Sequence, residues 1–126
     1  MCIRDSYFPG THRMGVVGKR GQGIKVSPAD EKVVILTAAG DMPDAILVSD
    51  HRANDLVQAC AIHGGQISEV KLAEDVATGV ELACGDSGDF VAADDTKDQF
   101  RIGRVQQAWV DDDLAQCFLN PRQWFA

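Results

Sequence analysis

Residues that favour turns interrupt this chain every eight to twelve positions, and that spacing constrains the fold more than any other feature of the sequence. Gly, Asp, Asn and Pro mark the interruptions, and the short segments between them are rich in Val, Ile, Leu and Thr. Such segments are typical of strands, and no apolar stripe of 3.6-residue period persists along the chain. The predicted strands are residues 23–27, 33–37, 45–49, 56–62, 67–72, 79–83, 89–92, 101–110 and 114–119.

The predicted fold is mainly β, a small single-domain β-barrel or β-sandwich of short antiparallel strands with a flexible N-terminal arm. The one helix candidate, around residues 50–56, is long enough for a single turn. The last two strands face each other across the acidic turn 111–113 and form a C-terminal hairpin. In residues 79–83 the alternation predicts that Val80 and Leu82 point into the core while Glu81 faces water.

The charge of the chain is divided unevenly. Residues 1–25 contain five basic residues and one acidic residue, whereas the rest of the chain contains seven basic and eighteen acidic ones. The N-terminal part is also rich in glycine, which loses much conformational entropy on ordering. We therefore predict a flexible basic arm over residues 1–22 and a β domain over residues 23–126. Deletion of this arm is then expected to leave the melting temperature of the β domain nearly unchanged. Residues 1–6 resemble a stretch found at the ends of reading frames assembled from short sequencing reads, and we interpret them as an assembly scar.

The overall balance is acidic, with a formal net charge of −7 and a pI near 4.7. An acidic chain is unsuited to a nucleic-acid backbone or an anionic membrane as its main partner. Its longest apolar runs stop after four residues, as at residues 33–36, and the first residues lack the apolar core of a secretory signal. We therefore expect no nucleic-acid partner, no membrane partner and no export.

The four cysteines, at positions 2, 60, 84 and 117, form no C-x-x-C pair, and none lies beside a histidine. This spacing argues against a zinc site, and nothing else in the sequence indicates a metal or a cofactor. Cys60, Cys84 and Cys117 each lie in an apolar segment. We interpret them as buried, reduced thiols rather than disulfide partners.

Three further motifs resemble catalytic or binding loops but lack the context that such chemistry needs. Gly85–Gly88 has the Gly-Asp-Ser-Gly string of serine proteases, yet the chain is about half the length of that fold, and we interpret the string as a β-turn. Gly18–Gly23 lacks the strand and helix of a phosphate loop, so we interpret it as a flexible basic linker. Asp94–Asp98 departs from the calcium-loop pattern, and His51 and His63 have no ligand or triad partner nearby in sequence. We expect the protein not to be an enzyme.

A longer pattern covers about 75 residues, across positions 45–120. It comprises Ala45–Val48, Gly64-Gly65, Val80–Asp86, the turn Ala93–Asp95, the segment Ile102–Ala108 and the closing segment Leu114–Pro121. This pattern resembles the small capsid decoration, or head cement, proteins of tailed bacteriophages, and the Ile102-Gly103-Arg104 piece is its most distinctive part. The sequence departs from that family at Val105–Gln107 and in the 111–113 turn.

The resemblance implies a structural virion protein made in the host cytoplasm. Such a protein decorates the outside of a capsid, is a homotrimer, and stabilises the shell by bridging major capsid proteins. We predict capsid contacts at the basic residues Arg13, Lys19, Arg20 and Lys25 and at the C-terminal aromatic residues Trp124 and Phe125. The alternative is a small cytoplasmic β-barrel that binds a ligand or serves as an accessory module.

Overall fold

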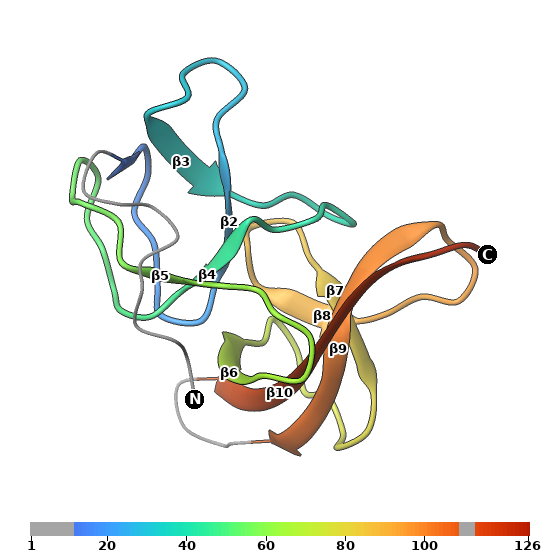
Figure 1. Cartoon of the computed structure of the whole chain (residues 1–126). Coiled ribbons are helices and arrows are strands. Elements are labelled where there is room, and N and C mark those ends of the chain that lie inside the picture. Colours follow the sequence, from blue (N-terminus) through green and yellow to red (C-terminus); the bar gives the residue numbers. More distant parts are fainter. Residues whose placement is uncertain (1–11, 109–112) are drawn as a thin grey trace.

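The computed structural model of the chain describes residues 12–108 and 113–126, and this part forms ten strands in two five-stranded sheets (Figure 1). The first sheet has the spatial order β1 (Arg13–Met14), β3 (Val33–Leu36), β2 (Gly23–Val26), β4 (Ala45–Leu47) and β5 (Ala59–Ala61). The second has the order β6 (Ile67–Lys71), β10 (Leu114–Trp124), β9 (Gln99–Ala108), β7 (Glu81–Cys84) and β8 (Phe90–Ala92). Within the described ranges, no helix is long and apolar enough to cross a membrane.

The predicted mainly β fold is confirmed, and each of the nine predicted strands coincides with an observed one to within a few residues. All strand pairs are antiparallel except that of β1 with β3. The strand β1 was not predicted, and residues 52–55 form turns instead of a helical turn.

The second sheet is strongly curled, so that its two edge strands, β6 and β8, approach each other at one point. We call this curled sheet the half-barrel. Leu72, just beyond β6, bridges to Phe90 in β8, and the amide of Ala73 donates to the Phe90 carbonyl over 2.9 Å. The first sheet joins this half-barrel through β4, because Ile46 packs into the core of the second sheet. Backbone hydrogen bonds from Gly23 to the Gly88 carbonyl, and from Gly88 to that of Thr37, add to this connection.

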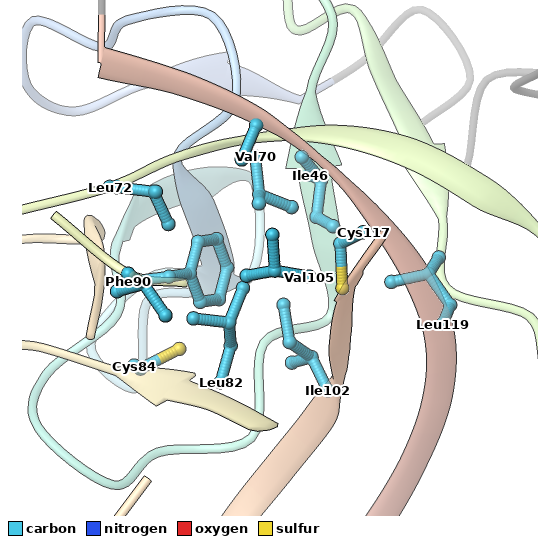
Figure 2. Close-up of a cluster of buried hydrophobic side chains, with 12 residues drawn as sticks. Ile46, Val70, Leu72, Leu82, Cys84, Phe90, Ile102, Val105, Cys117 and Leu119 are labelled. Atoms are coloured by element: carbon cyan, nitrogen blue, oxygen red, sulfur yellow. The ribbon is translucent and has the colours of Figure 1, made fainter. Parts of the chain in front are cut away.

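The main core lies inside the half-barrel, around the ring of Phe90 (Figure 2). Leu82, Ile102 and Val105 belong to the same cluster as that ring, and all four side chains are 0–1% exposed. A second, smaller cluster under the first sheet contains Met14, Ile24, Val34, Ala45, Leu47, Val57 and Ala59. The alternating pattern of the strands therefore fills two adjoining cores.

Residues 12–22 are part of the folded structure, so the prediction of a flexible arm is wrong for them. Met14 is 1% exposed, and Gly15 donates its amide to the Val34 carbonyl. Gly18 exchanges backbone hydrogen bonds with His51, and the Gly21 carbonyl accepts from the Lys71 amide. These tertiary contacts offset the entropy that the glycines lose on ordering. The remainder of the predicted arm, including the interpreted scar at residues 1–6, lies outside the described residues.

The predicted C-terminal strand ends too early, because β10 continues through Pro121 to Trp124. A register shift between Leu119 and Arg122 places Pro121 at an irregular point of the ladder, where its missing N–H is tolerated. The tail therefore adds cross-strand pairs with the start of β9. Residues 111–112 of the predicted acidic turn lie outside the described residues.

The side-chain directions predicted for residues 79–83 are confirmed for Val80 and Leu82. The prediction that Glu81 faces water is wrong. Leu82 is completely buried and Val80 packs against the same core. Glu81 does not simply face water, because its Oε1 lies 2.5 Å from Nη2 of Arg122 and its side chain is 30% exposed. The adjacent strand β10 thus supplies a partner that the alternation within β7 could not reveal.

Truncation of these two neighbours should have unequal effects on stability. We expect Leu82→Ala to lower the free energy of unfolding by about 2–5 kcal/mol, because it leaves a cavity in a filled core. Glu81→Ala should cost about 1 kcal/mol or less, since the ion pair that it removes is partly solvated. Urea denaturation of both variants measures the difference, and a larger loss for Glu81→Ala would contradict the observed register.

The three cysteines of the described part are buried, as predicted. Cys84 and Cys117 are free thiols, and burial raises their pKa to about 11 and about 12, respectively. Both therefore remain protonated near neutral pH, which makes them poor nucleophiles and poor metal ligands. The prediction of a reduced thiol is wrong at Cys60, which is disulfide-bonded.

Candidate functional site

A shallow hollow of about 600 Å³ lies where the 19–20 loop approaches the second sheet. Its lining comes from three separate parts of the chain: Lys19 and Arg20; Val48, Ser49 and Asp50; and Lys71, Asp113 and Leu114. A smaller hollow of about 300 Å³ shares Arg20 and Val48 with it and continues along β6. The additional residues of this second part are Leu47, Ile67, Ser68, Glu69 and Gln116. We call the two parts together the β6 groove.

The loop that carries Lys19 and Arg20 is held in place by its backbone. The Lys19 amide donates to Oε1 of Gln22 over 2.8 Å, and the Arg20 amide donates to Oδ1 of Asp50 over 2.8 Å. At the following position, Gly21 has a φ of +90° and its Cα lies against the backbone of β6, so a side chain there would clash with Lys71. The predicted linker is therefore an ordered turn that presents two exposed basic side chains beside the groove.

The other two predicted basic contacts are partly occupied by intramolecular bonds. Arg13, in β1, donates from Nη1 to the Asn54 carbonyl over 2.9 Å. Lys25, in β2, forms an ion pair with Asp41 whose Nζ and Oδ2 lie 2.5 Å apart. Neither residue lines the β6 groove.

The ion pair of Lys25 with Asp41 should make stability depend on acid pH. The hydrogen bond from Lys25, followed by one from the Ala38 amide, lowers the pKa of Asp41 in the folded state. The resulting stabilisation is complete above the unfolded-state pKa of about 4 and disappears as pH falls through the lowered folded-state pKa. We expect Asp41→Asn to be less stable than the wild type at pH 7, with the difference shrinking below about pH 4.

Denaturant unfolding from pH 7 down to pH 2 measures this difference. Asp86→Asn, at an exposed position of the 85–88 turn, is the control for removing one negative charge. A gap for Asp41→Asn that stayed constant down to pH 2 would contradict the role of the carboxylate.

The predicted aromatic contacts lie at the end of β10. The guanidinium carbon of Arg101 lies 3.9 Å from the centroid of the Trp124 ring, and Arg101 also binds Asp95 over 2.6 Å. One face of the Trp124 ring is therefore occupied within the chain. Phe125 is 72% exposed and follows the last residue of the strand.

The structure thus distributes the six predicted contact residues over several places. It brings only Lys19 and Arg20 together at one hollow. It also adds Lys71, which the sequence analysis did not single out. As a polar residue in an alternating strand, Lys71 has the pattern of an ordinary solvated position, and only the fold places it beside the 19–21 loop.

The motifs interpreted as turns have that role. Gly85–Gly88 connects β7 to β8, where the Gly85 amide donates to the Asp89 carbonyl and Gly88 has a φ of +80°. At the start of the 94–98 loop, Asp94 accepts hydrogen bonds from Thr96, which lower its pKa. Across residues 12–108 and 113–126, no group of three or more His, Cys, Asp or Glu side chains is placed to hold a metal ion.

His51 is a buried structural residue. It is 8% exposed, and its Nε2 accepts a hydrogen bond from the Gln58 amide over 2.9 Å. This bond requires the neutral tautomer with a proton on Nδ1. His51 is therefore held in the fold by a hydrogen bond from the backbone just before β5.

Comparison with known proteins identifies a structural neighbour. No protein-family model matches the chain, and no curated protein matches its sequence. The fold is similar to the crystal structure of the head fiber gp8.5 N base in bacteriophage phi29, with a TM-score of 0.70 and 16% sequence identity. The alignment covers 91% of this chain and 95% of that chain, so the two share nearly their whole fold.

Proposed function

We propose that this protein is a structural virion protein that decorates the outside of a bacteriophage capsid and stabilises it by bridging major capsid proteins. The observation that carries this proposal is the fold shared with the head fiber gp8.5 N base over 91% of the chain. A single fold can host unrelated functions, so a second line of support matters. Independently of this structural neighbour, the sequence pattern across residues 45–120 resembles the phage capsid decoration proteins, most distinctively at Ile102-Gly103-Arg104.

Two features of the molecule suit this role. The ordered turn at Lys19 and Arg20 offers exposed basic side chains on a body that is otherwise acidic, and Phe125 offers an exposed aromatic ring. Arginine and aromatic residues are enriched at protein interfaces. In the proposed assembly the protein is a homotrimer, and many copies with modest individual contacts stabilise the shell through avidity.

The second candidate function is a small ligand-binding or accessory module. The β6 groove is the observation in its favour, since concave sites of several hundred Å³ hold small ligands. Its lining combines charged groups with few large apolar side chains, which is less typical of such sites. We therefore favour a protein partner.

Cosedimentation tests the proposed function. The purified protein is mixed with shells assembled from the major capsid protein encoded in the same genome, and bound and free fractions are separated by centrifugation. We expect saturable binding, and bound shells that resist heat or dilution better than bare shells do. Sedimentation equilibrium of the free protein tests the trimer. A strict monomer that does not bind shells, and that instead binds a small molecule, would overturn the proposal in favour of the accessory module.

A further inference from the structure

Two separate contacts hold the backbone on either side of the exposed Phe125 ring, beside the loop that leads into β9 (Figure 1). Trp124, the residue before it, stacks its ring on Arg101, whose guanidinium carbon lies 3.9 Å from the ring centroid. Ala126, the residue after it, donates its amide to Oδ1 of Asp98 over 2.8 Å. The Phe125 ring between them is 72% exposed. The chain therefore directs an aromatic ring into solvent from a backbone that is held in place.

Both contacts depend on the loop 94–98. The side chain of Arg101 is 5% exposed, and its Nη2 donates to Oδ1 of Asp95 over 2.6 Å, which fixes the guanidinium. The loop is ordered from its first residue, whose amide donates to Oε1 of the buried Gln99 over 2.6 Å. Asp98, the last residue of the loop, supplies the second contact. One loop thus holds both neighbours of the exposed ring.

The two carboxylates of this loop differ in their importance for the fold. Asp95 neutralises the buried guanidinium of Arg101, so its removal would leave a buried charge without a partner. Asp98 is exposed and belongs to none of the ion pairs in the described part of the chain. A variant of Asp98 therefore reports on the position of the C-terminal residues rather than on the core.

We propose that Asp98 is a positioning residue for the capsid contact of Phe125. By holding the Ala126 amide, it keeps the ring in the orientation in which an apolar pocket of the shell protein receives it. Fixing a contact residue before binding removes part of the ordering cost of association, which raises affinity without a new contact. The inference rests on the proposed function, because it takes Phe125 as a residue that binds the shell.

Substitutions at Asp98 test this role in shell binding. Asp98→Ala removes the acceptor of the Ala126 amide, and we expect it to raise the Kd per site for shells about three- to tenfold. Asp98→Asn removes the charge but keeps a carbonyl oxygen that can accept the same bond, so it should bind as the wild type does. Equally weak binding by Asp98→Asn would mean that the negative charge matters instead of the position, and would overturn the inference.

The matched control is Asp30→Ala, in the connection between β2 and β3. It removes a similar exposed carboxylate, whose Oδ1 accepts the Lys32 amide over 3.0 Å. This variant should bind shells as the wild type does. Thermal unfolding of all three variants verifies that each retains the fold.

A double-mutant cycle shows whether Asp98 acts through Phe125. Phe125→Ala alone should raise the Kd about thirtyfold, the effect expected of an aromatic anchor. In that background Asp98→Ala should have no further effect, because the ring that it positions is gone. If Asp98→Ala weakens binding equally with and without the ring, Asp98 contacts the shell directly, and the positioning role is wrong.

Backbone dynamics test the same role without shells. The readouts are the ¹⁵N order parameter of Phe125 and the hydrogen-exchange rate of the Ala126 amide in the free protein. The wild type and Asp98→Asn should show an order parameter near that of rigid backbone, about 0.85, whereas Asp98→Ala should fall below about 0.6 and exchange faster at Ala126. A wild-type value as low as that of Asp98→Ala would overturn the inference.

The outcomes separate the two proposals. Wild-type protein that does not bind shells refutes the proposed function and the inference with it, whatever the mobility of Phe125. Normal binding by the wild type, together with unchanged binding by Asp98→Ala, refutes the inference alone and leaves the proposed function intact.

Discussion

A chain shortened to begin at Gly23 is expected to lose the cooperative unfolding transition of the full-length protein. The deletion removes β1 and with it Met14, whose side chain is 1% exposed in the second core cluster. Loss of a buried side chain of this size alone costs about 2–5 kcal/mol, a large part of the 5–15 kcal/mol that stabilises a typical domain. The deletion also removes the Gly21 carbonyl, which accepts a hydrogen bond from the Lys71 amide in β6.

Circular dichroism during thermal unfolding checks this expectation. Two point variants distinguish lost packing from lost chain length. Met14→Ala should reproduce a loss of about 2–5 kcal/mol, whereas Val17→Ala, at a side chain that is 59% exposed, should change stability by less than about 0.5 kcal/mol. A shortened chain with an unchanged melting temperature would mean that the first sheet does not depend on residues 12–22.

The second large effect is expected at Gly103, in the most distinctive segment of the sequence. Gly103 has a φ of +149°, and a Cβ at this position would overlap the carbonyl oxygen of Phe118 on the neighbouring strand. Gly103→Ala must therefore both strain its own backbone and push β9 away from β10. Strain and overpacking each cost about 1–3 kcal/mol, so we expect a combined loss of about 2–6 kcal/mol in urea denaturation.

Gly64→Ala is the matched control, because no atom lies within 4 Å of the Cβ that it would add. This substitution should leave stability nearly unchanged, or raise it by about 0.4–1 kcal/mol by restricting the unfolded chain. If Gly103→Ala proved as mild as Gly64→Ala, the close approach of β9 and β10 at this point would be refuted. In that case glycine at position 103 would need another explanation.

The candidate site could be predicted from the sequence only in part. Lys19 and Arg20 were predictable as a pair because they are adjacent in a basic, glycine-rich segment. Lys71 belongs to a strand about fifty residues later, and it reaches the same hollow only because Gly21 pairs with β6. Nothing in the sequence distinguishes Arg13 and Lys25 from Lys19 as predicted contact residues. In the fold, however, Arg13 binds the Asn54 carbonyl and Lys25 forms an ion pair with Asp41.

The sequence by itself determined most of the strands, because alternation and turn residues act over a few neighbouring positions. The alternation at residues 79–83 specifies that Val80 and Leu82 point into a core whatever the sheet order is. Only the tertiary structure decided that residues 12–22 are ordered, because their glycines predicted a flexible segment. Their order comes from Met14 filling a core and from backbone bonds to strands far along the chain. Such contacts join residues distant in sequence, so no local pattern records them, and their free energy exceeds the local entropic preference for disorder.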